Sequence, residues 1–380
     1  MKLILGYSKT GESVARFLAK TGEKFVIYDD KNPVDLPEYD IVIKSPGVPL
    51  SHPLCAGKKV ITDLDLFKPR AKVIALTGSS GKTTLATLIY NFLKANNIET
   101  ALGGNIGIPV LDLPVLSENG IYILEMSSFQ LETEPALEID IAIFLNFMPN
   151  HLDRHETMEK YFQAKMNIFK HAKAGIVSPQ VRHGERAAAL AKAAAWPSMD
   201  HHGAFHAPRD DNPAAILEKV AELLNLSKTH IPSVIKNLEP LEHRLEKIAE
   251  KNNVIYINDS KSTTFFSVAY GIDNTKDLGE IHLIMGGLLK ENDPSYLLPF
   301  LSHVKHLYIF GQDREKIRQL FNTGETFETL EDVMTHLKLN PKKKSVVLLS
   351  PGGTSFDLYQ NYIERGKHFK AIVKNIPSHL

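Results

Sequence analysis

The sequence predicts an α/β fold of three domains, each built on a mostly parallel sheet. Short apolar runs rich in branched residues alternate along the chain with segments of helical period, and this alternation is typical of parallel sheets covered by helices. Most of the runs end in Gly, Asp or Ser, as strands do where a loop follows. The length of 380 residues suits two or three domains of about 150 residues each. We expect domains at residues 1–70, 71–238 and 239–380.

The N-terminal domain begins with KLILGYSKTGESVARFLAKTGEKFVIYDDK, which predicts a strand, a glycine turn, a helix and a second strand. Gly6 and Gly11 lie in the turn, and IVIKSPGV, with Gly47 near its end, predicts a further strand and turn. The arrangement resembles half of a Rossmann nucleotide-binding unit. The spacing G-x-x-x-x-G differs from the dinucleotide fingerprint G-x-G-x-x-G, so a purely structural turn remains an open interpretation.

The central domain opens with VIALTGSSGKTTLATLI, residues 73–89, which has the features of a phosphate-binding loop. A strand and a helix flank its glycines, and backbone N–H groups at the start of such a helix bind anions. Lys82 would reach the terminal phosphates, and the Thr83 hydroxyl would bind Mg²⁺. Gly78 lies closer to Gly81 than the common pattern G-x-x-x-x-G-K-[ST] requires. A glycine turn without a ligand is the alternative, which the Lys-Thr-Thr that follows disfavours.

Two further strands of the central domain end in polar residues. The strand in GIYILEMSSF ends at Glu125, and His151 follows the strand IAIFLNF. Ligands bind beyond the carboxyl ends of parallel strands, and a carboxylate there holds Mg²⁺ in P-loop enzymes. The sequence leaves both a structural and a site role open for His151. Residues 198–213 predict a loop whose irregularly spaced histidines indicate solvated surface rather than a metal site.

Lys165 lies in an unusual setting, on a predicted helix of residues 157–171. Its neighbours one turn away are all aromatic or aliphatic: Tyr161, Phe162, Ile168 and Phe169. Such neighbours would desolvate the amine and lower its pKa. The residues alone favour the other interpretation, in which the lysine snorkels and keeps its charged end in water.

The C-terminal domain contains four predicted strands, NVIYIND, IHLIMGG, HLYIFG and SVVLLSPG. Each ends in Gly, Asp or Ser, and segments of helical period lie between them. Asp259, the pair Gly286 and Gly287, and residues 350–355 therefore lie at the carboxyl ends of strands, where we expect function.

The composition excludes several classes of protein. Lys plus Arg equals Asp plus Glu, 44 each, so bulk charge gives no support to nucleic-acid or membrane-surface binding. Cys55 is the one cysteine, which rules out an intramolecular disulfide and fits a reducing compartment. The apolar run near the N-terminus is too short for a signal peptide, and no run has the length of a membrane span. A cytoplasmic protein is expected.

Seven motifs resemble those of the Mur ligases, ATP-dependent enzymes that form the amide bonds of the bacterial cell-wall peptide: TGSSGKTT, GGNIGIP, EMSSFQLE, NHLDRH, AKMNIF, EHRLE and NDSKSTT. They occur in the order typical of that family, and the resemblance covers nearly the whole chain. The tight glycine spacing of the phosphate loop is a trait of the family. The C-terminal segment LLSPGGTSFDLYQNYIERGKHF most resembles the branch that adds D-glutamate.

The resemblance implies a central P-loop ATP-binding domain between two Rossmann-like domains, the first for a UDP-linked substrate and the last for an amino acid. It implies that ATP converts the carboxylate of UDP-N-acetylmuramoyl-L-alanine into an acyl phosphate, which the amine of D-glutamate attacks. It also implies two Mg²⁺ ions and a CO₂-derived carbamate on Lys165. A monomeric enzyme of peptidoglycan synthesis, and hence of cell shape and cell division, is expected, without nucleic acid or membrane insertion.

The resemblance assigns site residues by position in four groups. The ATP group is Gly78, Ser79, Ser80, Gly81, Lys82, Thr83, Thr84, Asn212, Arg244, Asp259 and Lys261. The metal group is Thr83, Glu125, His151 and Lys165, and the catalytic residues are Lys82, His151 and Lys165. The UDP-substrate group is Lys9, Thr10, Asp30, Lys31, Gly47, Asn105, Ser127 and Gln130. The amino-acid group is Thr263, Lys290, Ser355 and Tyr362.

Other functions remain open at this point. Diaminopimelate-adding ligases carry D-N-P-R in the C-terminal domain, whereas DDNPAA lacks the Arg and lies before that domain. Folylpolyglutamate synthases share the architecture, but EMSSFQLE and the short N-terminal domain favour the Mur branch. A small-molecule kinase would form ADP without incorporating an amine, and a non-catalytic P-loop protein would lack the metal set. Two motifs depart from the family: DSKATN reads DSKSTT, with Thr264 in place of Asn, and GGxDK reads GGLLK, which ends at Lys290.

Overall fold

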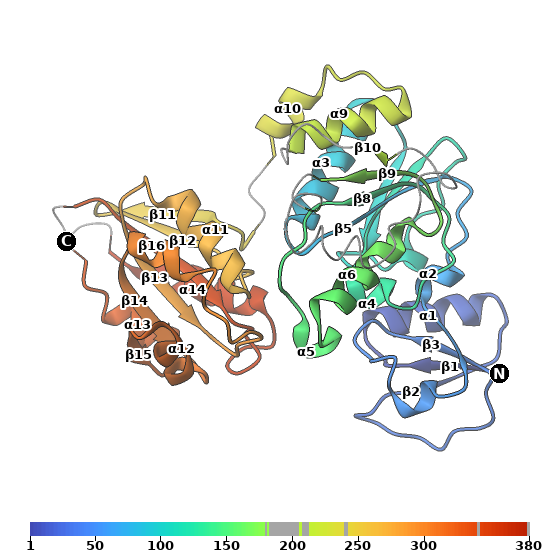
Figure 1. The fold of residues 1–380 in the computed structure, drawn as a ribbon, viewed down its shortest axis with the longest axis horizontal. Coiled ribbons are helices and arrows are strands. Elements are labelled where there is room, and N and C mark those ends of the chain that lie inside the picture. Colours follow the sequence, from blue (N-terminus) through green and yellow to red (C-terminus); the bar gives the residue numbers. More distant parts are fainter. Residues whose placement is uncertain (179–180, 182–204, 207–212, 239–241, 340–342, 378–380) are drawn as a thin grey trace. The chain divides into compact units, whose positions relative to one another are not determined.

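The computed structural model describes residues 1–178, 181, 205–206, 213–238, 242–339 and 343–377. The chain forms two compact units, one of Met1–Pro149 with Arg154–Leu238 and one of Asn150–Asp153 with Glu239–Leu380. The described residues form three sheets, two in the first unit and one in the second (Figure 1). The α/β fold with mostly parallel sheets is confirmed. Each range predicted as a domain contains one sheet, and the domain boundaries stay a prediction.

The N-terminal sheet is parallel, in the order β2-β1-β3-β4. Its strands are β1 (Lys2–Leu5), β2 (Phe25–Tyr28), β3 (Ile41–Lys44) and β4 (Lys59–Ile61). Helix α1 (Lys9–Lys20) packs Val14 and Leu18 on this sheet. A side chain on Gly11 would lie 2.2 Å from the carbonyl oxygen of Gly6, so the turn requires glycine there. The predicted strand, turn, helix and strand are confirmed, and Cys55 is buried on the other face of the sheet.

The central sheet is parallel, in the order β10-β9-β8-β5-β7-β6. Its strands are β5 (Lys72–Thr77), β6 (Thr100–Gly104), β7 (Ile121–Glu125), β8 (Ile139–Phe144), β9 (Ala172–Val177) and β10 (Phe205–His206). Successive side chains of β5 enter two different cores, Val73 on one face and Ile74 on the other. Residues 198–213, predicted as a loop, include the short strand β10, which pairs with β9. They also include Pro213, where helix α9 begins.

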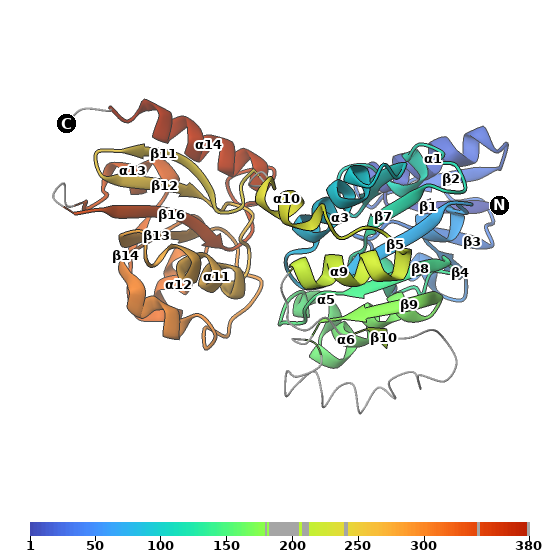
Figure 2. The same ribbon diagram turned by 90° about the horizontal axis from the view of Figure 1, so that it is seen from above.

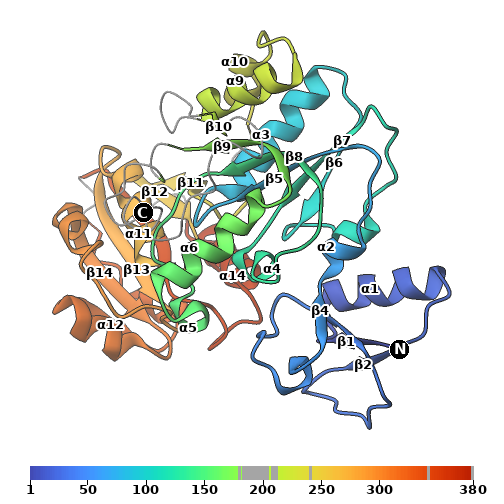
Figure 3. The same ribbon diagram turned by 45° about the vertical axis from the view of Figure 1, so that its right-hand side comes forward.

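Helices cover both faces of the central sheet. Among the described residues of the first unit, the helices beyond α1 include α2 (Asp63–Leu66), α3 (Lys82–Ala95), α4 (Ser128–Leu131), α6 (Met158–Met166), α9 (Pro213–Leu224) and α10 (Ile231–Lys236). Helices α3, α9 and α10 share one core (Figure 1), and α4 and α6 lie on the opposite side of β5 (Figure 3). The helix predicted over residues 157–171 is shorter, since a 3₁₀ turn, Asn167–Phe169, follows α6.

The C-terminal sheet is parallel except for β11, in the order β11-β12-β16-β13-β14-β15. Its strands are β11 (Glu246–Lys251), β12 (Val254–Asn258), β13 (Glu280–Gly286), β14 (Val304–Phe310), β15 (Glu325–Phe327) and β16 (Ser345–Gly352). Its helices are α11 (Phe265–Thr275), α12 (Arg314–Phe321), α13 (Leu330–Thr335) and α14 (Tyr362–Asn375). Helices α11 and α12 share one core and α13 and α14 the other, on opposite faces of the sheet (Figure 2). Within the described residues, no helix combines the length and apolar character needed to cross a membrane.

Candidate active site

The glycine loop joins β5, in the middle of the central sheet, to the start of α3. Gly81 adopts a left-handed φ of 73° directly before Lys82, the first residue of α3, a conformation that favours glycine. A side chain on Gly78 would lie 3.1 Å from Leu145, so the loop packs closely on the segment after β8. Because β5 lies between β7 and β8, the residues that follow these three strands meet at one edge of the sheet.

Asn146, which follows β8, binds the glycine loop. Its side-chain oxygen accepts hydrogen bonds from the backbone N–H groups of Ser79 at 3.0 Å and Ser80 at 2.9 Å, and its amide donates to the carbonyl of Ser80 at 3.1 Å. The hydroxyl of Ser79 lies 3.1 Å from the hydroxyl of Tyr161 on α6. The loop is therefore held in shape by side chains from two neighbouring elements, and sequence reasoning missed Asn146 and Tyr161.

Lys82 folds back over the loop, where its Nζ donates to the carbonyl oxygen of Gly78 at 2.8 Å. The cation therefore lies beside the loop amides that would receive phosphates. Contact of Lys82 with the terminal phosphates of a nucleotide stays a prediction.

Glu125 and Thr83 form an oxygen-rich group at the same edge. Thr83 Oγ1 donates to Glu125 Oε2 at 2.8 Å, and Asn105 Nδ2 donates to Glu125 Oε1 at 3.0 Å. The Glu125 side chain comes from the end of β7 and is buried. A buried carboxylate with a hydroxyl beside it is a donor set that fits a hard cation such as Mg²⁺.

The amine of Lys165 is buried at the bottom of the loop. Its Nζ donates to the carbonyl oxygen of Gly78 at 2.9 Å and lies 4.7 Å from the centre of the Tyr161 ring. The residue is 1% exposed, so the expectation of a snorkelling lysine with its end in water is wrong. Burial lowers the pKa of Lys165 well below its ordinary value, and the Lys82 cation lowers it further, while Glu125 acts in the opposite direction. The neutral amine is therefore favoured.

Two predicted residues of the metal and ATP groups, His151 and Asn212, do not belong to the described part of the first unit. His151 adopts a left-handed φ of 54° just before helix α5 (Leu152–His155), and it belongs to the second compact unit. Asn212 lies outside the described residues.

Five of the predicted UDP-substrate residues follow three strands of the N-terminal sheet, β1, β2 and β3. Lys9 and Thr10 begin α1 after the Gly6 turn. The carboxylate of Asp30 lies 3.2 Å from His52 Nε2, and Asp29 rather than Asp30 accepts hydrogen bonds from the backbone of Tyr7 and Lys31. Gly47 lies in the loop after β3, and no atom beyond its chain neighbours would be within 4 Å of an added side chain.

Ser127 and Gln130 begin α4 as a reciprocal cap. The Ser127 hydroxyl accepts from the backbone N–H of Gln130 at 3.3 Å, and the Gln130 side-chain oxygen accepts from the backbone N–H of Ser127 at 3.1 Å. Ser127 and Gln130 lie two and five residues after Glu125, the last residue of β7, so the cap fixes both just beyond the end of that strand.

The C-terminal unit holds the remaining predicted ATP contacts. Asp259 is buried and accepts hydrogen bonds from the Ser350 hydroxyl at 2.8 Å and the Leu245 N–H at 3.2 Å. Burial raises the pKa of Asp259 to about 7. Lys261 Nζ lies 5.1 Å from the centre of the Tyr362 ring. Asp259 thus joins the segment that contains Arg244 to the end of β16. Lys261 lies against Tyr362, a residue of the predicted amino-acid group.

The predicted amino-acid residues come from three connected segments. Leu288 and Thr354 exchange backbone hydrogen bonds of 3.0 and 2.8 Å, which join the loop of Lys290 to the loop of Ser355. The Glu291 carboxylate accepts a hydrogen bond from the backbone N–H of Phe265, at the start of α11 next to Thr263. Ser355 is itself buried. These contacts link the backbones that carry Thr263, Lys290 and Ser355.

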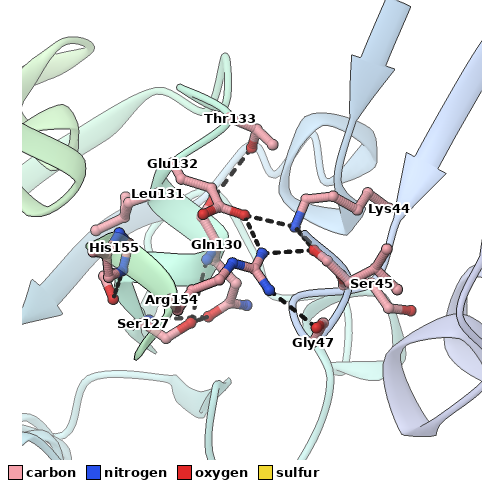
Figure 4. A network of polar contacts seen from close by, with 12 residues as sticks. Lys44, Ser45, Gly47, Ser127, Gln130, Leu131, Glu132, Thr133, Arg154 and His155 are labelled. Atoms are coloured by element: carbon pink, nitrogen blue, oxygen red, sulfur yellow. Dashed lines mark hydrogen bonds and ion pairs between the residues drawn. The ribbon is translucent and has the colours of Figure 1, made fainter. Parts of the chain in front are cut away.

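Three charged residues that the sequence did not single out connect two parts of the first unit. Lys44 ends β3, Glu132 follows α4 and Arg154 lies in α5. Glu132 Oε1 accepts from Lys44 Nζ at 3.0 Å and from Arg154 Nη2 at 2.6 Å (Figure 4). They lie next to Gly47, since Arg154 Nη1 donates to its carbonyl at 3.1 Å.

Comparison with known proteins identifies full-length relatives. A family model described as the Mur ligase middle domain matches residues 76–196. The UDP-N-acetylmuramoylalanine–D-glutamate ligase of Vibrio vulnificus (strain YJ016) is 31% identical, with 98% of this chain and 97% of the relative covered. The ligase of the same name from Vibrio campbellii (strain ATCC BAA-1116) is 33% identical, with 89% of this chain and 84% of the relative covered.

Solved structures share the fold. UDP-N-acetylmuramate-alanine ligase MurC from Thermotoga maritima matches with a TM-score of 0.60 at 13% identity, over 98% of this chain and 99% of that chain. MurF from Acinetobacter baumannii matches with a TM-score of 0.60 at 16% identity, over 98% of this chain and 89% of that chain. FolC of E. coli, in complex with DHPP and ADP, matches with a TM-score of 0.58 at 15% identity, over 82% of this chain and 91% of that chain. At these identities the likeness concerns the fold alone.

Proposed function

This chain belongs to the family of UDP-N-acetylmuramoylalanine–D-glutamate ligases, a branch of the Mur ligases, and we propose that it joins D-glutamate to UDP-N-acetylmuramoyl-L-alanine with conversion of ATP to ADP and phosphate. The single observation that carries the proposal from family to chemistry is the group of side chains around the glycine loop. Lys82 and Thr83 of α3, Glu125 of β7 and Lys165 of α6 meet at one edge of the central sheet.

The glycine loop is the ATP site in this proposal. The backbone N–H groups at the start of α3 would receive the phosphates, and Lys82 would place a positive charge on the transferring phosphoryl group. Thr83 and Glu125 would hold a Mg²⁺ ion, a role supported by their 2.8 Å contact and by the burial of the carboxylate. Bound there, Mg²⁺ would neutralise the charge of the phosphate oxygens.

We assign a carbamate to Lys165. A neutral amine attacks CO₂, a nitrogen–carbon bond forms and the nitrogen loses its proton, which leaves an anionic carboxylate-like group. The buried position of Lys165 and its lowered pKa support this modification, because they favour the neutral amine. The product would offer oxygen ligands to a second Mg²⁺, with His151 as the partner that the family resemblance proposes.

The acceptor carboxylate and the amino acid would bind on either side of the phosphoryl group. Residues of the UDP-substrate loops, Gly47 and the capped pair Ser127 and Gln130, are assigned to the UDP-linked acceptor. Lys290 and Ser355 are assigned to the amino acid. An ammonium and hydroxyl groups suit a dicarboxylate such as glutamate, whereas the far amine of lysine or diaminopimelate would lie near the Lys290 cation.

The reaction that follows has two steps. A carboxylate oxygen of the acceptor attacks the γ-phosphorus of ATP, the bond to ADP breaks and an acyl phosphate forms. The amine of D-glutamate then attacks the acyl carbon, an amide bond forms and phosphate leaves with the bonding electron pair. Lys82 would hold its positive charge on the transferring group in the first step. Arg244 and Lys261, which the C-terminal unit carries, are assigned to the nucleotide by the family resemblance.

The test is phosphate release from ATP with UDP-N-acetylmuramoyl-L-alanine and a panel of D- and L-amino acids, with the amide product identified by mass. D-glutamate should support release, and lysine and diaminopimelate should not. An arm with a folate acceptor and L-glutamate tests the folylpolyglutamate synthase alternative. ADP formation without amine incorporation would indicate a kinase and overturn the proposal. A monomeric state and a cytoplasmic location stay predictions, the latter supported by the single, buried thiol of Cys55.

A further inference from the structure

Lys44, Glu132 and Arg154 form a closed ring of hydrogen bonds with one backbone carbonyl (Figure 4). Glu132 Oε1 accepts from both cations, Lys44 Nζ at 3.0 Å and Arg154 Nη2 at 2.6 Å. The carbonyl oxygen of Val48 accepts from the same two atoms, at 2.8 Å from Lys44 and 2.7 Å from Arg154. Each acceptor therefore bridges the same pair of donors, and none of the four groups can move without breaking two hydrogen bonds.

The ring is shielded from water. The side chain of Lys44 is 0% exposed, and those of Glu132 and Arg154 are 12% and 15% exposed. Ion pairs on the surface contribute little to stability, but breaking one that is buried leaves an uncompensated charge at a large cost in stability. The Lys44, Glu132 and Arg154 group also carries one positive charge in excess, so Glu132 is the member on which the other two depend.

The ring joins two segments that carry candidate substrate residues. On one side it holds the loop after β3, because Val48 is a ring member and Arg154 Nη1 also donates to the carbonyl of Gly47 at 3.1 Å. On the other side Glu132 directly follows the short helix α4, whose first turn holds the capped pair Ser127 and Gln130. One network thus fixes the spacing between the Gly47 loop and the start of α4.

We propose that Lys44, Glu132 and Arg154 are positioning residues that hold the loop of residues 45–48 at a fixed distance from α4, so that both segments grip the UDP-linked substrate together. The proposal rests on the proposed function for the identity of that substrate. The three residues act through the backbone of Gly47 and Val48. Loss of the ring should weaken binding of the UDP-linked substrate and leave ATP binding at the glycine loop unaffected.

The order of effects among variants distinguishes a charge ring from ordinary packing. In Glu132→Gln the two buried cations face each other without their carboxylate, so this variant should be the most impaired. In Lys44→Met the remaining pair of Glu132 and Arg154 is neutral, so the effect should be smaller. The double variant Lys44→Met/Glu132→Gln removes one of the two repelling cations and should recover part of the loss caused by Glu132→Gln alone.

The experiment measures KM for UDP-N-acetylmuramoyl-L-alanine, KM for ATP and kcat in these three variants and in Glu156→Gln, an exposed control that breaks the Glu156–Lys160 pair. Glu132→Gln should raise KM for UDP-N-acetylmuramoyl-L-alanine about tenfold or more, because a displaced loop of residues 45–48 would lose a hydrogen bond to the charged substrate, which is worth at least that factor. KM for ATP and kcat should change little, and the control should resemble wild type. Equal rises in both KM values, or a double variant that is more impaired than Glu132→Gln, would overturn the proposal that the ring positions the loop of residues 45–48.

Hydrogen exchange of the backbone amides in residues 45–48 gives a readout that needs no substrate. Exchange there should be faster in Glu132→Gln than in wild type and partly restored in the double variant, while exchange at the glycine loop stays unchanged. If the wild-type protein does not ligate D-glutamate, the proposed function is wrong. Hydrogen exchange still tests whether the ring holds the loop of residues 45–48. Unchanged exchange of the amides in residues 45–48 of Glu132→Gln would overturn the positioning role of the ring, whatever the substrate. Lys44→Met supplies the same comparison if Glu132→Gln does not fold.

Discussion

The side-chain amine of Lys165 and the carbonyl oxygen of Gly78 lie 2.9 Å apart, although 87 residues separate them in the chain. The same carbonyl accepts from Lys82 at 2.8 Å. Two amines therefore meet at one oxygen of the glycine loop, one of them buried. Burial first, and then the neighbouring Lys82 cation, lower the pKa of Lys165, so the neutral form of its amine is favoured.

The pH dependence of stability should reveal this amine. Its native pKa lies below the ordinary 10.5, so between these two values the unfolded protein binds more protons and the free energy of unfolding rises with pH. Lys165→Met lacks the amine. Its stability relative to wild type should therefore be highest below the native pKa and decline as pH rises toward 10.5. Urea unfolding in CO₂-free buffers measures the difference, and a difference independent of pH would contradict a lowered pKa.

Replacement of Lys82 should stop turnover without unfolding the protein. Lys82→Ala loses the positive charge beside the loop amides, and kcat should fall by at least about 10²–10³-fold, as for other lost charge-stabilising donors. The melting temperature should be close to wild type, because Lys82 is only partly buried and its Nζ bonds to the Gly78 and Ser79 carbonyls lie within one loop. Lys94→Ala, in the last turn of the same helix, is the matched control. Turnover of Lys82→Ala near that of the control would refute the ATP assignment.

Asn146 should set the affinity for ATP, since its side-chain oxygen occupies two loop amides. In Asn146→Asp a carboxylate would hold those amides more strongly and would repel the phosphates. KM for ATP should rise about tenfold or more, because a hydrogen bond to a charged group is worth at least that factor, with little change in KM for the UDP-linked substrate. Asn322→Asp, in the C-terminal unit, adds the same charge elsewhere. If the two variants bind ATP equally well, Asn146 does not control the loop.

Ser355 should contribute to glutamate binding. Ser355→Ala should raise KM for D-glutamate, since a hydrogen bond to a charged group contributes about 1.5–3 kcal/mol. The backbone of this loop should keep its shape, because it is held by carbonyl contacts of Ser355 to the N–H groups of Leu358 and Tyr359. Steady-state kinetics with D-glutamate, using exposed Ser302→Ala as control, measures the effect. No change in KM for D-glutamate, or efficient ligation of lysine by wild type, would remove Ser355 from the pocket.

The elements that the sequence predicts well are those with local signals. The strand that ends at Thr77 is an apolar run, and Gly81 and Lys82 mark the turn and helix start by residue type alone. Glu125 was found in the same way, because it ends a run of five buried residues. Such patterns place a residue at the edge of a sheet, and the parallel order of strands then brings these edges together.

The features that the sequence misses depend on distant partners. The helical neighbours of Lys165 indicated apolar surroundings but not the loop that covers its amine, so its burial was not foreseen. Lys44 ends β3 of the N-terminal sheet, and its local sequence does not indicate a partner. That partner, Glu132, follows α4 in the connection after β7 of the central sheet. In the sequence, Asn146 resembles any other asparagine of a loop. Only its contacts in the folded protein distinguish it. Contacts of this kind are set by the packing of whole elements rather than by local residue type.

The N-terminal sheet carries its own chemical reporter. Cys55 is the chain's one cysteine, it is buried against β1 and β3, and burial raises the pKa of its thiol. A thiol reagent can reach it only when this part of the sheet opens, so the labelling rate under native conditions measures the free energy of that opening. The charged ring begins at Lys44, the last residue of β3. The labelling rate of this native cysteine therefore reports how strongly the charged ring stabilises β3, in wild type and in every variant, without an introduced probe.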